Sequence, residues 1–419
     1  MTVIAPPQRA FTATATVPSD KSCSHRALVL AAMAEGQSRV GITGTGADVA
    51  ATQGAIHALG VEVEGDRVLS RGIRGWRAPR RPIDCANSGT TMRILAGALA
   101  GSRLTVTLEG DESLSHRPMR RLTEALAPLG GRIDTADGTP PVTVVGRPLH
   151  GAEVGLPIAS AQVRTAVALA ALSAQGPTLI DSPAGFRDHT ERWLAAMGRG
   201  ARRSDTAFEV APGPVPPLEL TVPGDPSSAA FLWAAAALSP GSAVTTPGVG
   251  LNPGRLGLLT VLERMGAVVE VEEAGAVLGD PWGNVTVTGA GLSGVEVAGS
   301  LSTACLDELP LVAVLAASAD GETVVRDAAE LRVKESDRIA ASVRMVRALG
   351  GEAAASEDGF VIGGGGVMGG TVEAGGDHRI AMAGAVAAVA ARSPVRVEGF
   401  EVAAVSWPGF ETALESLWS

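Results

Sequence analysis

Positively charged side chains are gathered in a few short turns of this sequence. Lys21 and Arg26 lie in DKSCSHRAL, and Arg93 lies in NSGTTMR. The turns GDESLSHRPMRR, ELRVKESDRI and GDHRIAM hold the others: Arg117, Arg120, Arg121, Arg332, Lys334, Arg338 and Arg379. Arginine binds carboxylates through paired hydrogen bonds, and lysine presents a compact charge that suits phosphate. A single arginine is most often a surface charge, but the whole set predicts a binding site for a small polyanion.

Two acidic residues lie beside these cations. Asp307 precedes the apolar run LPLVAVLAA, and Glu335 stands between Lys334 and Arg338. A carboxylate that is partly buried and close to other charges can act as a general acid or base. The structural alternatives are an N-cap for Asp307 and a helix-surface ion pair with Arg338 for Glu335. The residues alone leave both interpretations open.

The histidines and cysteines show no metal-binding pattern. His378, between Asp377 and Arg379, is a candidate active-site residue because its neighbours and a helix start could orient its ring. His25 has a similar place in DKSCSHRAL. The other histidines share no ligand spacing, and the cysteines are far apart: His57, His116, His150, His189, Cys23, Cys85 and Cys305. We therefore predict no bound metal and no disulfide framework, and we expect buried structural thiols.

The composition excludes several classes of protein. The 419-residue chain has 34 basic and 44 acidic side chains, and its formal net charge is −10. General nucleic-acid binding needs a basic face and is not expected. No apolar run approaches the roughly 18 residues of a membrane span, and no basic segment followed by an apolar core predicts a secretory signal. With only 3 dispersed cysteines, we expect a cytoplasmic protein.

Lysine is rare in this chain. Lys21 and Lys334 are its only lysines, and the other basic side chains are arginine. Lysine at these two positions indicates a need for a compact ammonium group, with chance as the alternative. Both residues lie in the cation-rich turns.

The cation-rich turns belong to an internal repeat. Six segments each join a short polar turn to a helix-like run of Ala and Leu, and most end in Gly. They begin at Asp20, Asn87, Ser160, Gly224, Leu306 and Gly376. Ser, Asp and Asn are favoured N-caps, and the N–H groups of a helix start attract anions. A purely structural repeat protein would carry the same caps.

A second helix and further strands complete each repeat. In GLLTVLERMGAVVEV, for example, a helical run from Gly257 ends at Gly266, and alternating Val and Glu follow. Glycine after the last turn and the alternation predict a helix C-cap and a strand. The repeats predict an α/β fold with three strand–helix–strand–helix–strand units in each of two domains. The Pro-rich segment Ala211–Asp225 is the expected hinge.

The same turns match, in order, the sequence blocks of a known family. DKSCSHRALVLAA, NSGTTMR, GDESLSHRPM and SAQVRTA are followed by RDHTERWL, VPGDPSSAAF, ELRVKESDRI and GDHRIAM. Together these blocks span nearly the whole chain and are highly specific, although any one of them alone would not be. By these blocks the chain resembles the EPSP synthase branch of the enolpyruvyl transferase family.

The resemblance implies a two-lobed α/β fold. Each lobe would be an inside-out α/β barrel of three βαβαββ units, which gives six repeats in all. Residues 20–222 would form the N-terminal lobe, and residues 1–19 with 223–419 would form the C-terminal lobe, which includes the first strand. The active site would lie in the interdomain cleft, and the protein would be a monomer.

The resemblance also implies a reaction. The 5-hydroxyl group of shikimate 3-phosphate attacks C2 of phosphoenolpyruvate while C3 is protonated. The tetrahedral intermediate then loses phosphate and leaves an enolpyruvyl ether, a step of chorismate and aromatic amino-acid biosynthesis. The implied partners are these two small molecules, with no nucleic acid and no membrane. The chemistry requires no metal and no organic cofactor.

Functional positions of the family fall on residues of this chain. Asp307 matches the residue that holds the hydroxyl and serves as base, Glu335 the candidate acid, and His378 a supporting histidine; Lys21 completes the catalytic set. The shikimate 3-phosphate contacts match Lys21, Ser22, Arg26, Ser160, Ala161, Gln162, Asp307 and Lys334. The phosphoenolpyruvate contacts match Lys21, Gly89, Arg117, Gln162, Arg338 and Arg379.

Some positions depart from the family pattern. Val405 stands where the family often has a lysine, so a phosphoenolpyruvate contact is either missing or supplied by another residue, and sensitivity to glyphosate is left open. Smaller departures are His116, Arg164, Thr165 and Phe186.

Two other functions are weighed against this one. UDP-N-acetylglucosamine enolpyruvyl transferase has the same fold and donor, but it carries a reactive cysteine in a mobile loop, and none occurs in Gly110–Arg121. A non-catalytic anion-binding relative would have no need of Asp307, Glu335 and Lys21.

Overall fold

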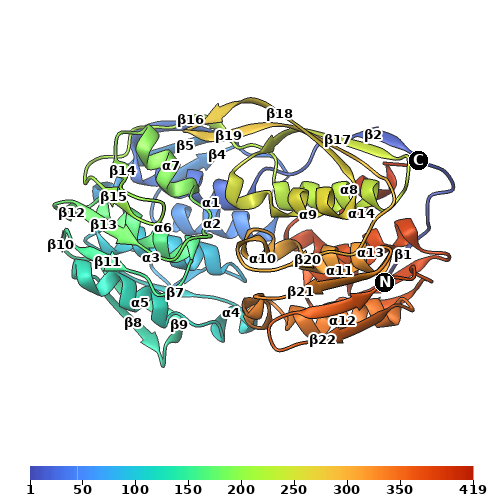
Figure 1. Cartoon of the computed structure of the whole chain (residues 1–419). Helices are drawn as coiled ribbons and strands as arrows, with labels where there is room; N and C mark the ends of the chain where they lie inside the picture. Colours follow the sequence, from blue (N-terminus) through green and yellow to red (C-terminus); the bar gives the residue numbers. More distant parts are fainter. Residues whose placement is uncertain (45, 419) are drawn as a thin grey trace. The chain divides into compact units, whose positions relative to one another are not determined.

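The chain folds into two units, which Figure 1 shows coloured along the sequence. The computed structural model describes residues 1–44 and 46–418. Unit 1 comprises Met1–Pro18, Pro223–Gly275 and the residues from Pro281 onward, and unit 2 comprises Ser19–Val222 and Ala276–Asp280. The chain leaves unit 2 between Val222 and Pro223, within the Pro-rich segment expected as a hinge.

Ser19 and residues 276–280, which the prediction placed in the C-terminal lobe, belong to unit 2. The Ser19 hydroxyl donates to the carbonyl of Val222 (3.2 Å), and the Ser19 N–H donates to the carbonyl of Thr43 (3.0 Å). Asp280, the last residue of the second segment, is hydrogen-bonded to the ring of His189. These partners are distant in sequence, so local patterning could not assign either segment.

Unit 2 contains three four-stranded sheets with one connectivity. In each, the first and second strands are parallel, and the other neighbouring strands are antiparallel. In sheet order they are β16 (Glu219–Thr221), β3 (Glu35–Gly41), β5 (Arg67–Arg71), β4 (Glu62–Glu64); β6 (Ile83–Asp84), β7 (Thr105–Glu109), β9 (Thr139–Val145), β8 (Arg132–Ala136); and β11 (Glu153–Gly155), β13 (Thr178–Asp181), β15 (Phe208–Val210), β14 (Gly200–Arg202). Short strands β10 (Leu149–His150) and β12 (Ala174–Gln175) form a parallel pair.

Helices connect these strands. Those of unit 2 are α1 (Lys21–Met33), α2 (Ala47–Ala58), α3 (Gly89–Ala100), α4 (Glu112–Ser115), α5 (Arg120–Leu126), α6 (Ala161–Ala171) and α7 (His189–Ala196). Those of unit 1 are α8 (Pro226–Ala237), α9 (Gly257–Met265), α10 (Ser300–Ala304), α11 (Leu309–Ala317), α12 (Arg338–Ala348), α13 (His378–Ala387) and α14 (Phe410–Glu415). No described helix is long and apolar enough to cross a membrane.

Two sheets of unit 1 have the same four-stranded pattern, and its third sheet has three strands. Its sheets are β2 (Thr12–Thr14), β17 (Ala243–Gly250), β19 (Asp280–Thr288), β18 (Val268–Val277); β20 (Glu296–Val297), β21 (Glu322–Val325), β23 (Phe360–Gly363), β22 (Glu352–Ala355); and β24 (Gly370–Glu373), β25 (Val395–Glu398), β1 (Thr2–Ile4). The first two strands of each are again parallel. The α/β fold of repeated βαβαββ units, predicted from the sequence, is confirmed.

Strands close to the chain crossings complete the first sheet of each unit. β16 ends just before the chain leaves unit 2 and pairs in parallel with β3. β2 precedes the entry into unit 2 and pairs in parallel with β17 of unit 1. The third sheet of unit 1 gains the N-terminal strand β1, which is antiparallel to β25. Each unit is therefore closed by a strand from a distant part of the chain.

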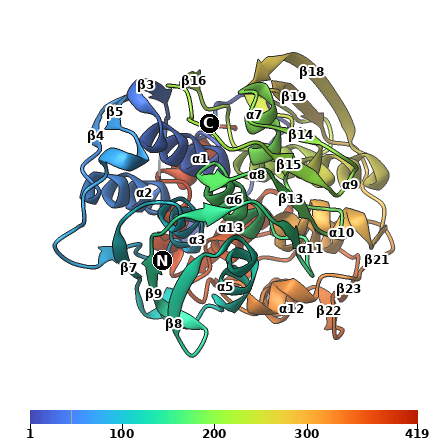
Figure 2. The same cartoon turned by 90° about the vertical axis from the view of Figure 1, so that its left-hand side faces the viewer.

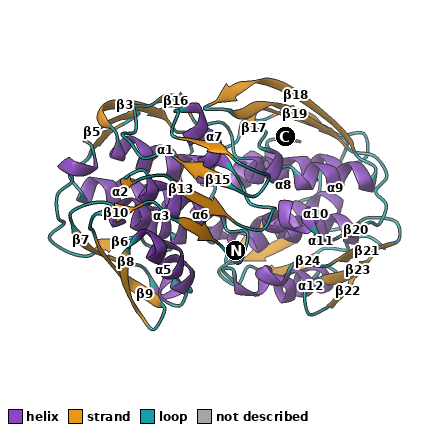
Figure 3. Cartoon of the chain, turned by 60° about the vertical axis from the view of Figure 1, so that its left-hand side comes forward, coloured by secondary structure: helices purple, strands orange, loops and turns teal. Residues whose placement is uncertain are grey.

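The helices rich in small residues form the centre of each unit. In unit 2, α1 packs on α3 and α3 packs on α6 (Figure 2); in unit 1, α8, α11 and α13 pack on one another. Every residue of these last three helices is buried. A Cβ added to Gly97 would lie 2.2 Å from the carbonyl oxygen of Ala166, so glycine is required where α3 and α6 touch. The sheets lie outside these helices (Figure 3).

The helices predicted from the repeat are all found. The six segments rich in Ala and Leu form α1, α3, α6, α8, α11 and α13. The run from Gly257 forms α9, which ends at Gly266 with φ 108°, a left-handed conformation that glycine adopts without strain. Each unit has its own hydrophobic core.

Candidate active site

Polar residues at the starts of the central helices act as caps. Side chains accept hydrogen bonds from backbone N–H groups in the first turns of α1, α3, α6, α8 and α13; the capping residues are Asp20, Ser88, Ser160, Asp225 and Asp377. Within the described chain, no side chain caps α11, and Asp307 lies in the preceding 3₁₀ turn Leu306–Glu308. The N-cap interpretation of Asp307 is therefore wrong.

In unit 1, Asp307 lies in a cluster of charges. Its Oδ1 is 3.7 Å from Lys334 Nζ and 3.4 Å from Arg338 Nη1. Arg338 Nη2 donates to Glu335 Oε2 at 2.6 Å, which is the predicted ion pair. Four predicted site residues are thus brought into direct contact.

A buried carboxylate that was not predicted as a site residue organises this cluster. Asp377 is 0 % exposed, and its Oδ2 accepts from Arg338 Nε at 2.8 Å and from the Ser336 hydroxyl at 2.9 Å. Burial disfavours the charged forms of Asp377 and Arg338, but the ion pair between them outweighs the effect of burial. Asp377 keeps a lowered pKa because of Arg338, and Arg338 keeps a raised pKa because of Glu335, Asp377 and Asp307. Arg338 is therefore a permanent cation that three carboxylates share.

His378 and Arg379 are the first two residues of α13. His378 is buried, and the Arg379 N–H donates to Asp377 Oδ1 at 2.9 Å. The Arg379 guanidinium lies 3.4 Å from Glu308 Oε1 and 5.8 Å from the centre of the Phe231 ring. The Glu308 carboxylate and the face of the Phe231 ring hold this guanidinium at the helix start.

In unit 2, Lys21 is held by a carboxylate that the sequence did not single out. Lys21 Nζ donates to Asp48 Oδ2 at 2.8 Å, and Asp48 lies in the first turn of α2. Lys21 is the first residue of α1, so its ammonium group lies at a helix N-terminus. Ser22 follows, and its carbonyl accepts from Arg26 Nη1 at 2.8 Å.

Arg26 is buried and held by two threonines of the third repeat. Its Nε donates to the Thr190 hydroxyl (2.8 Å), and its Nη2 donates to the Thr165 hydroxyl (2.9 Å). Burial lowers the pKa of Arg26, although Cys23 and Glu191 partly oppose the shift. Thr165 is one of the departures from the family pattern, and it retains a hydroxyl that orients this cation.

Three predicted phosphoenolpyruvate positions gather around Arg93. Arg93 Nη1 donates to Gln162 Oε1 at 2.7 Å, and a Cβ on Gly89 would lie 2.8 Å from Arg93 Nη1 and 3.5 Å from Arg117 Nη1. Burial, with Arg117 and Arg121 nearby, lowers the pKa of Arg93 to about 10. Since like charges destabilise one another here, an anion bound at this place would be favoured.

The start of α6 supplies the remaining predicted contacts of unit 2. Ser160 caps this helix by accepting from the Val163 N–H at 3.4 Å, and Ala161 is the first helical residue. Gln162 Nε2 donates to the Thr90 hydroxyl at 2.9 Å, which ties the start of α6 to the start of α3. The side chain of Gln162 thus joins the start of α6 to the cation-bearing turn at the start of α3.

His25 is a structural residue. Its Nδ1 is 2.6 Å from the Thr52 hydroxyl, which is 2.6 Å from the Thr91 hydroxyl, and all three residues are buried. Burial lowers the pKa of His25 to about 3, with Asp48 opposing and Lys21 and Arg26 adding to the shift. His25 is therefore neutral at physiological pH.

The cysteines are buried and free, as predicted. Cys23, however, lies beside Asp20 and His189, and one donor atom from each falls within 4.8 Å of the others. The prediction of no metal site rested on spacing along the chain, and spacing could not show a cluster whose Cys and His are 166 residues apart.

Val405 ends the 3₁₀ segment Phe400–Val405 and is partly buried. An apolar residue of this size offers no charge to a substrate.

Together the fold and the helix-start clusters define a two-domain α/β protein with cations and carboxylates arranged for small anions. Two solved structures of EPSP synthase from Acinetobacter baumannii have this fold. One has a TM-score of 0.89 at 37 % identity and covers 99 % of this chain and 97 % of its own. The other has a TM-score of 0.88 at 36 % identity, with coverage of 99 % and 98 %.

Sequence comparisons agree with the structures. The enzymes named 3-phosphoshikimate 1-carboxyvinyltransferase from Herpetosiphon aurantiacus and Roseiflexus castenholzii are 45 % and 44 % identical, over 94 % and 99 % of each chain. The profile of the family EPSP synthase (3-phosphoshikimate 1-carboxyvinyltransferase) matches residues 6–414. The chain belongs to the EPSP synthase family, and the resemblance drawn from its motifs is confirmed.

Proposed function

We propose that this chain transfers the enolpyruvyl group of phosphoenolpyruvate to the 5-hydroxyl group of shikimate 3-phosphate and releases phosphate. The reaction belongs to chorismate and aromatic amino-acid biosynthesis. The observation that carries the proposal is the Asp307–Lys334–Arg338 cluster, found in a chain that matches the family along its whole length.

Asp307 acts as the general base in this proposal. Its two cationic neighbours favour the ionised carboxylate, which can accept the proton of the substrate hydroxyl. The hydroxyl oxygen then forms a bond to C2 of phosphoenolpyruvate, and a proton is added at C3. Loss of a proton from the resulting methyl group, with departure of phosphate, forms the enolpyruvyl ether.

Glu335 supplies the C3 proton. In the substrate-free protein its carboxylate accepts a hydrogen bond from Arg338, which favours the ionised form. When the carboxylate of phosphoenolpyruvate binds Arg338, it competes with Glu335 for the same guanidinium. Glu335 then has a weaker partner and a second negative charge nearby, and both changes raise its proton affinity. Substrate binding would therefore convert an ion-pair partner into an acid.

The remaining predicted residues bind the anionic substrates. For shikimate 3-phosphate we propose Lys21, Ser22, Arg26, Ser160, Ala161, Gln162, Asp307 and Lys334; for phosphoenolpyruvate, Lys21, Gly89, Arg117, Gln162, Arg338 and Arg379. Several belong to the starts of α1, α3, α6 and α13, where backbone N–H groups and the helix dipole favour anions. His378 supports the site from the start of α13. Two phosphorylated substrates repel each other, and these cations offset the repulsion.

The proposed contacts are divided between the two units, so both units must act on one pair of substrates. We propose that this happens in an interdomain cleft that closes on the substrates and excludes water. Small-angle scattering with and without both substrates tests closure, and identical curves would contradict it. We further propose a cytoplasmic monomer, for which sedimentation measures the mass in solution.

Phosphate release from phosphoenolpyruvate tests the reaction. The acceptors compared are shikimate 3-phosphate, UDP-N-acetylglucosamine and none, with the product identified by mass spectrometry. Release with shikimate 3-phosphate alone, together with its enolpyruvyl ether, is the expected result. Release with the sugar nucleotide alone would show that the chain is instead a UDP-N-acetylglucosamine enolpyruvyl transferase. No release from a folded protein would indicate lost activity or a changed acceptor.

A further inference from the structure

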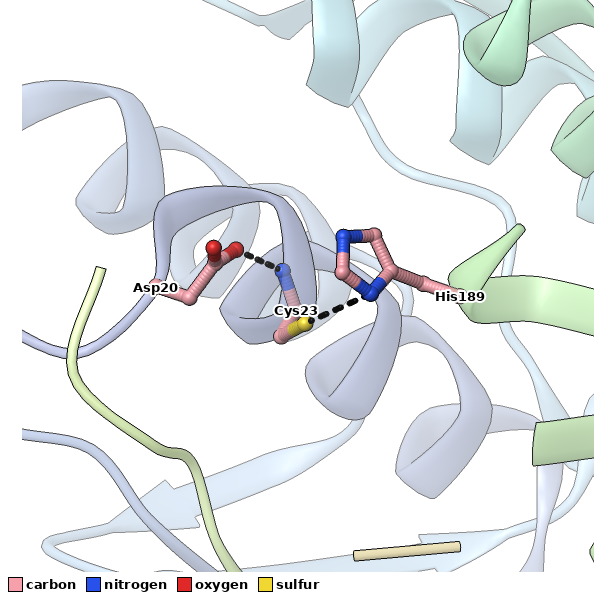
Figure 4. Close-up of side chains that lie close together, drawn as sticks. All are labelled: Asp20, Cys23 and His189. Atoms are coloured by element: carbon pink, nitrogen blue, oxygen red, sulfur yellow. Dashed lines mark hydrogen bonds between the residues drawn. The ribbon is translucent and has the colours of Figure 1, made fainter. Parts of the chain in front are cut away.

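We propose that Asp20, Cys23 and His189, assisted by Asp280, form a binding site for a soft divalent metal ion such as Zn²⁺. Figure 4 shows the first three side chains at the start of α1 and the start of α7. Cys23 Sγ lies 3.5 Å from His189 Nδ1, and the three donor atoms lie within 4.8 Å of one another. Thiolate, imidazole and carboxylate are the ligand types that Zn²⁺ takes in proteins.

The spacing of the donors fits tetrahedral coordination. Zn–S bonds of about 2.3 Å and Zn–N bonds of about 2.0–2.1 Å, at a tetrahedral angle, separate sulfur and nitrogen by about 3.5 Å. The observed distance between Cys23 Sγ and His189 Nδ1 is 3.5 Å. An oxygen of the Asp20 carboxylate lies within 4.8 Å of the other two donor atoms and would move closer on coordination. Cys23 and His189 are therefore already placed as a pair of ligands would be.

A fourth oxygen donor lies at the same imidazole nitrogen. Asp280, which belongs to unit 2, is hydrogen-bonded through Oδ2 to His189 Nδ1. In a nucleophilic triad the thiol and the carboxylate would meet opposite nitrogens of the ring. Here both meet Nδ1, so the arrangement cannot relay a proton in that way, whereas a metal ion at Nδ1 would draw in both groups.

Burial and rigidity favour the site. Asp20, Cys23 and His189 are 2 %, 4 % and 3 % exposed, so the donors are held away from competing water. Asp20 Oδ1 also accepts from the Cys23 N–H at 2.7 Å, which fixes these two residues on one helical turn. On binding, the thiol loses its proton to solvent and the neutral imidazole carries its proton on Nε2, so Nδ1 becomes the ligand.

The site adjoins the turn that we propose to bind shikimate 3-phosphate. Cys23 lies directly after Lys21 and Ser22, and Asp20 caps the same helix. A metal ion that draws Asp20 and Cys23 together would shift this turn. We therefore expect Zn²⁺ to weaken binding of shikimate 3-phosphate; this consequence rests on the proposed function, whereas metal binding itself does not.

Titration of the full chain with Co²⁺ in the absence of substrates tests the site. Co²⁺ takes the same ligands as Zn²⁺, and a Co–thiolate bond gives an intense charge-transfer band in the near ultraviolet. We expect about one Co²⁺ per chain, the appearance of this band, and its loss when Zn²⁺ displaces Co²⁺. We expect C23S to abolish the band and to weaken Co²⁺ binding by at least the roughly 10–100-fold that loss of an outer-shell partner causes.

Two comparisons make the test decisive. C85S removes a buried thiol outside this cluster and should keep the band. The pKa of the Cys85 thiol is raised to about 12 by burial and by the nearby Asp84 and Glu109. H189Q should weaken binding as C23S does, with circular dichroism showing that each variant is folded. No thiolate band in the wild type, or a band that C23S and H189Q both retain, would overturn the proposal. If Co²⁺ binds but no phosphate is released with shikimate 3-phosphate, the proposed reaction fails and the metal site stands.

Discussion

Substitution of Asp377 by Asn or Ala separates the two roles of this buried carboxylate. Its charge pairs with Arg338, and its side chain caps α13. Removing one partner of a buried ion pair costs about 3–5 kcal/mol. Because Arg338 keeps Glu335 and Asp307, we expect the lower end, about 3 kcal/mol, for D377N. Asn can still cap a helix and Ala cannot, so D377A should lose about 1 kcal/mol more stability than D377N.

Asp337 provides a matched control. It also caps a helix, α12, and pairs with an arginine, Arg332, at 2.6 Å, but this pair is 35 % and 39 % exposed. An exposed pair contributes only about 0–1 kcal/mol. D337N should therefore cost at most about 1 kcal/mol, although it makes the same chemical change as D377N.

Native-state hydrogen exchange of amides in α12 and α13 measures these free energies of opening. The pH dependence supplies a second check. Arg338 lowers the pKa of Asp377 in the folded protein, so the charge contribution is complete above the usual Asp pKa of about 3.9 and is lost as the pH falls below it. The difference in free energy of opening between wild type and D377N should therefore become smaller only in acid. This account of the cluster would be refuted if the free energy of opening of D377N at pH 7 lay within about 0.5 kcal/mol of the wild-type value. Equal losses of this free energy in D377N and D337N would also refute it.

Three further outcomes are expected. D307N should lower kcat by about 10²–10⁴-fold in the phosphate-release assay without unfolding the protein, and unchanged turnover would remove Asp307 as the base. G89A should raise KM for phosphoenolpyruvate more than KM for the acceptor, because the added Cβ would lie 2.8 Å from Arg93 Nη1; equal changes in both values would contradict this. Buried His25, whose folded pKa is about 3, binds its proton more readily when unfolded, so stability should fall by up to about 1.4 kcal/mol per pH unit from about pH 6.5 downward. H25N should lack this slope in acid unfolding, and an identical pH profile would show that His25 is not its source.

The helices and their starts could be predicted because their signals are local. A polar cap, a run of Ala and Leu, and a following Gly all fall within one short segment, as in α9 from Gly257 to Met265 with Gly266 after it. Most cation-bearing turns could be found in the same way. The repeat then predicted strand–helix–strand–helix–strand units, but not the order of the strands within each sheet.

The partners of these cations could not be predicted, because they lie on other helices and in some cases in other repeats. Lys21 pairs with Asp48, and Arg26 is held by Thr165 and Thr190. Asp377 was visible only as a neighbour of His378, and nothing in its sequence context shows that its carboxylate reaches Arg338 across the fold. Pairings at this distance depend on how the repeats pack, which periodicity does not encode.

Each of the two lysines lies beside a carboxylate of its own unit. Lys21 is 2.8 Å from Asp48 and Lys334 is 3.7 Å from Asp307, and their side chains are 29 % and 30 % exposed. An ammonium group has three N–H donors around a compact charge, so it can hold a carboxylate and donate to a phosphate or hydroxyl oxygen at the same time. A guanidinium is planar and larger, and its paired donors would be taken up by the carboxylate. A chain that uses arginine at every other basic position therefore has a physical reason to keep lysine at these two.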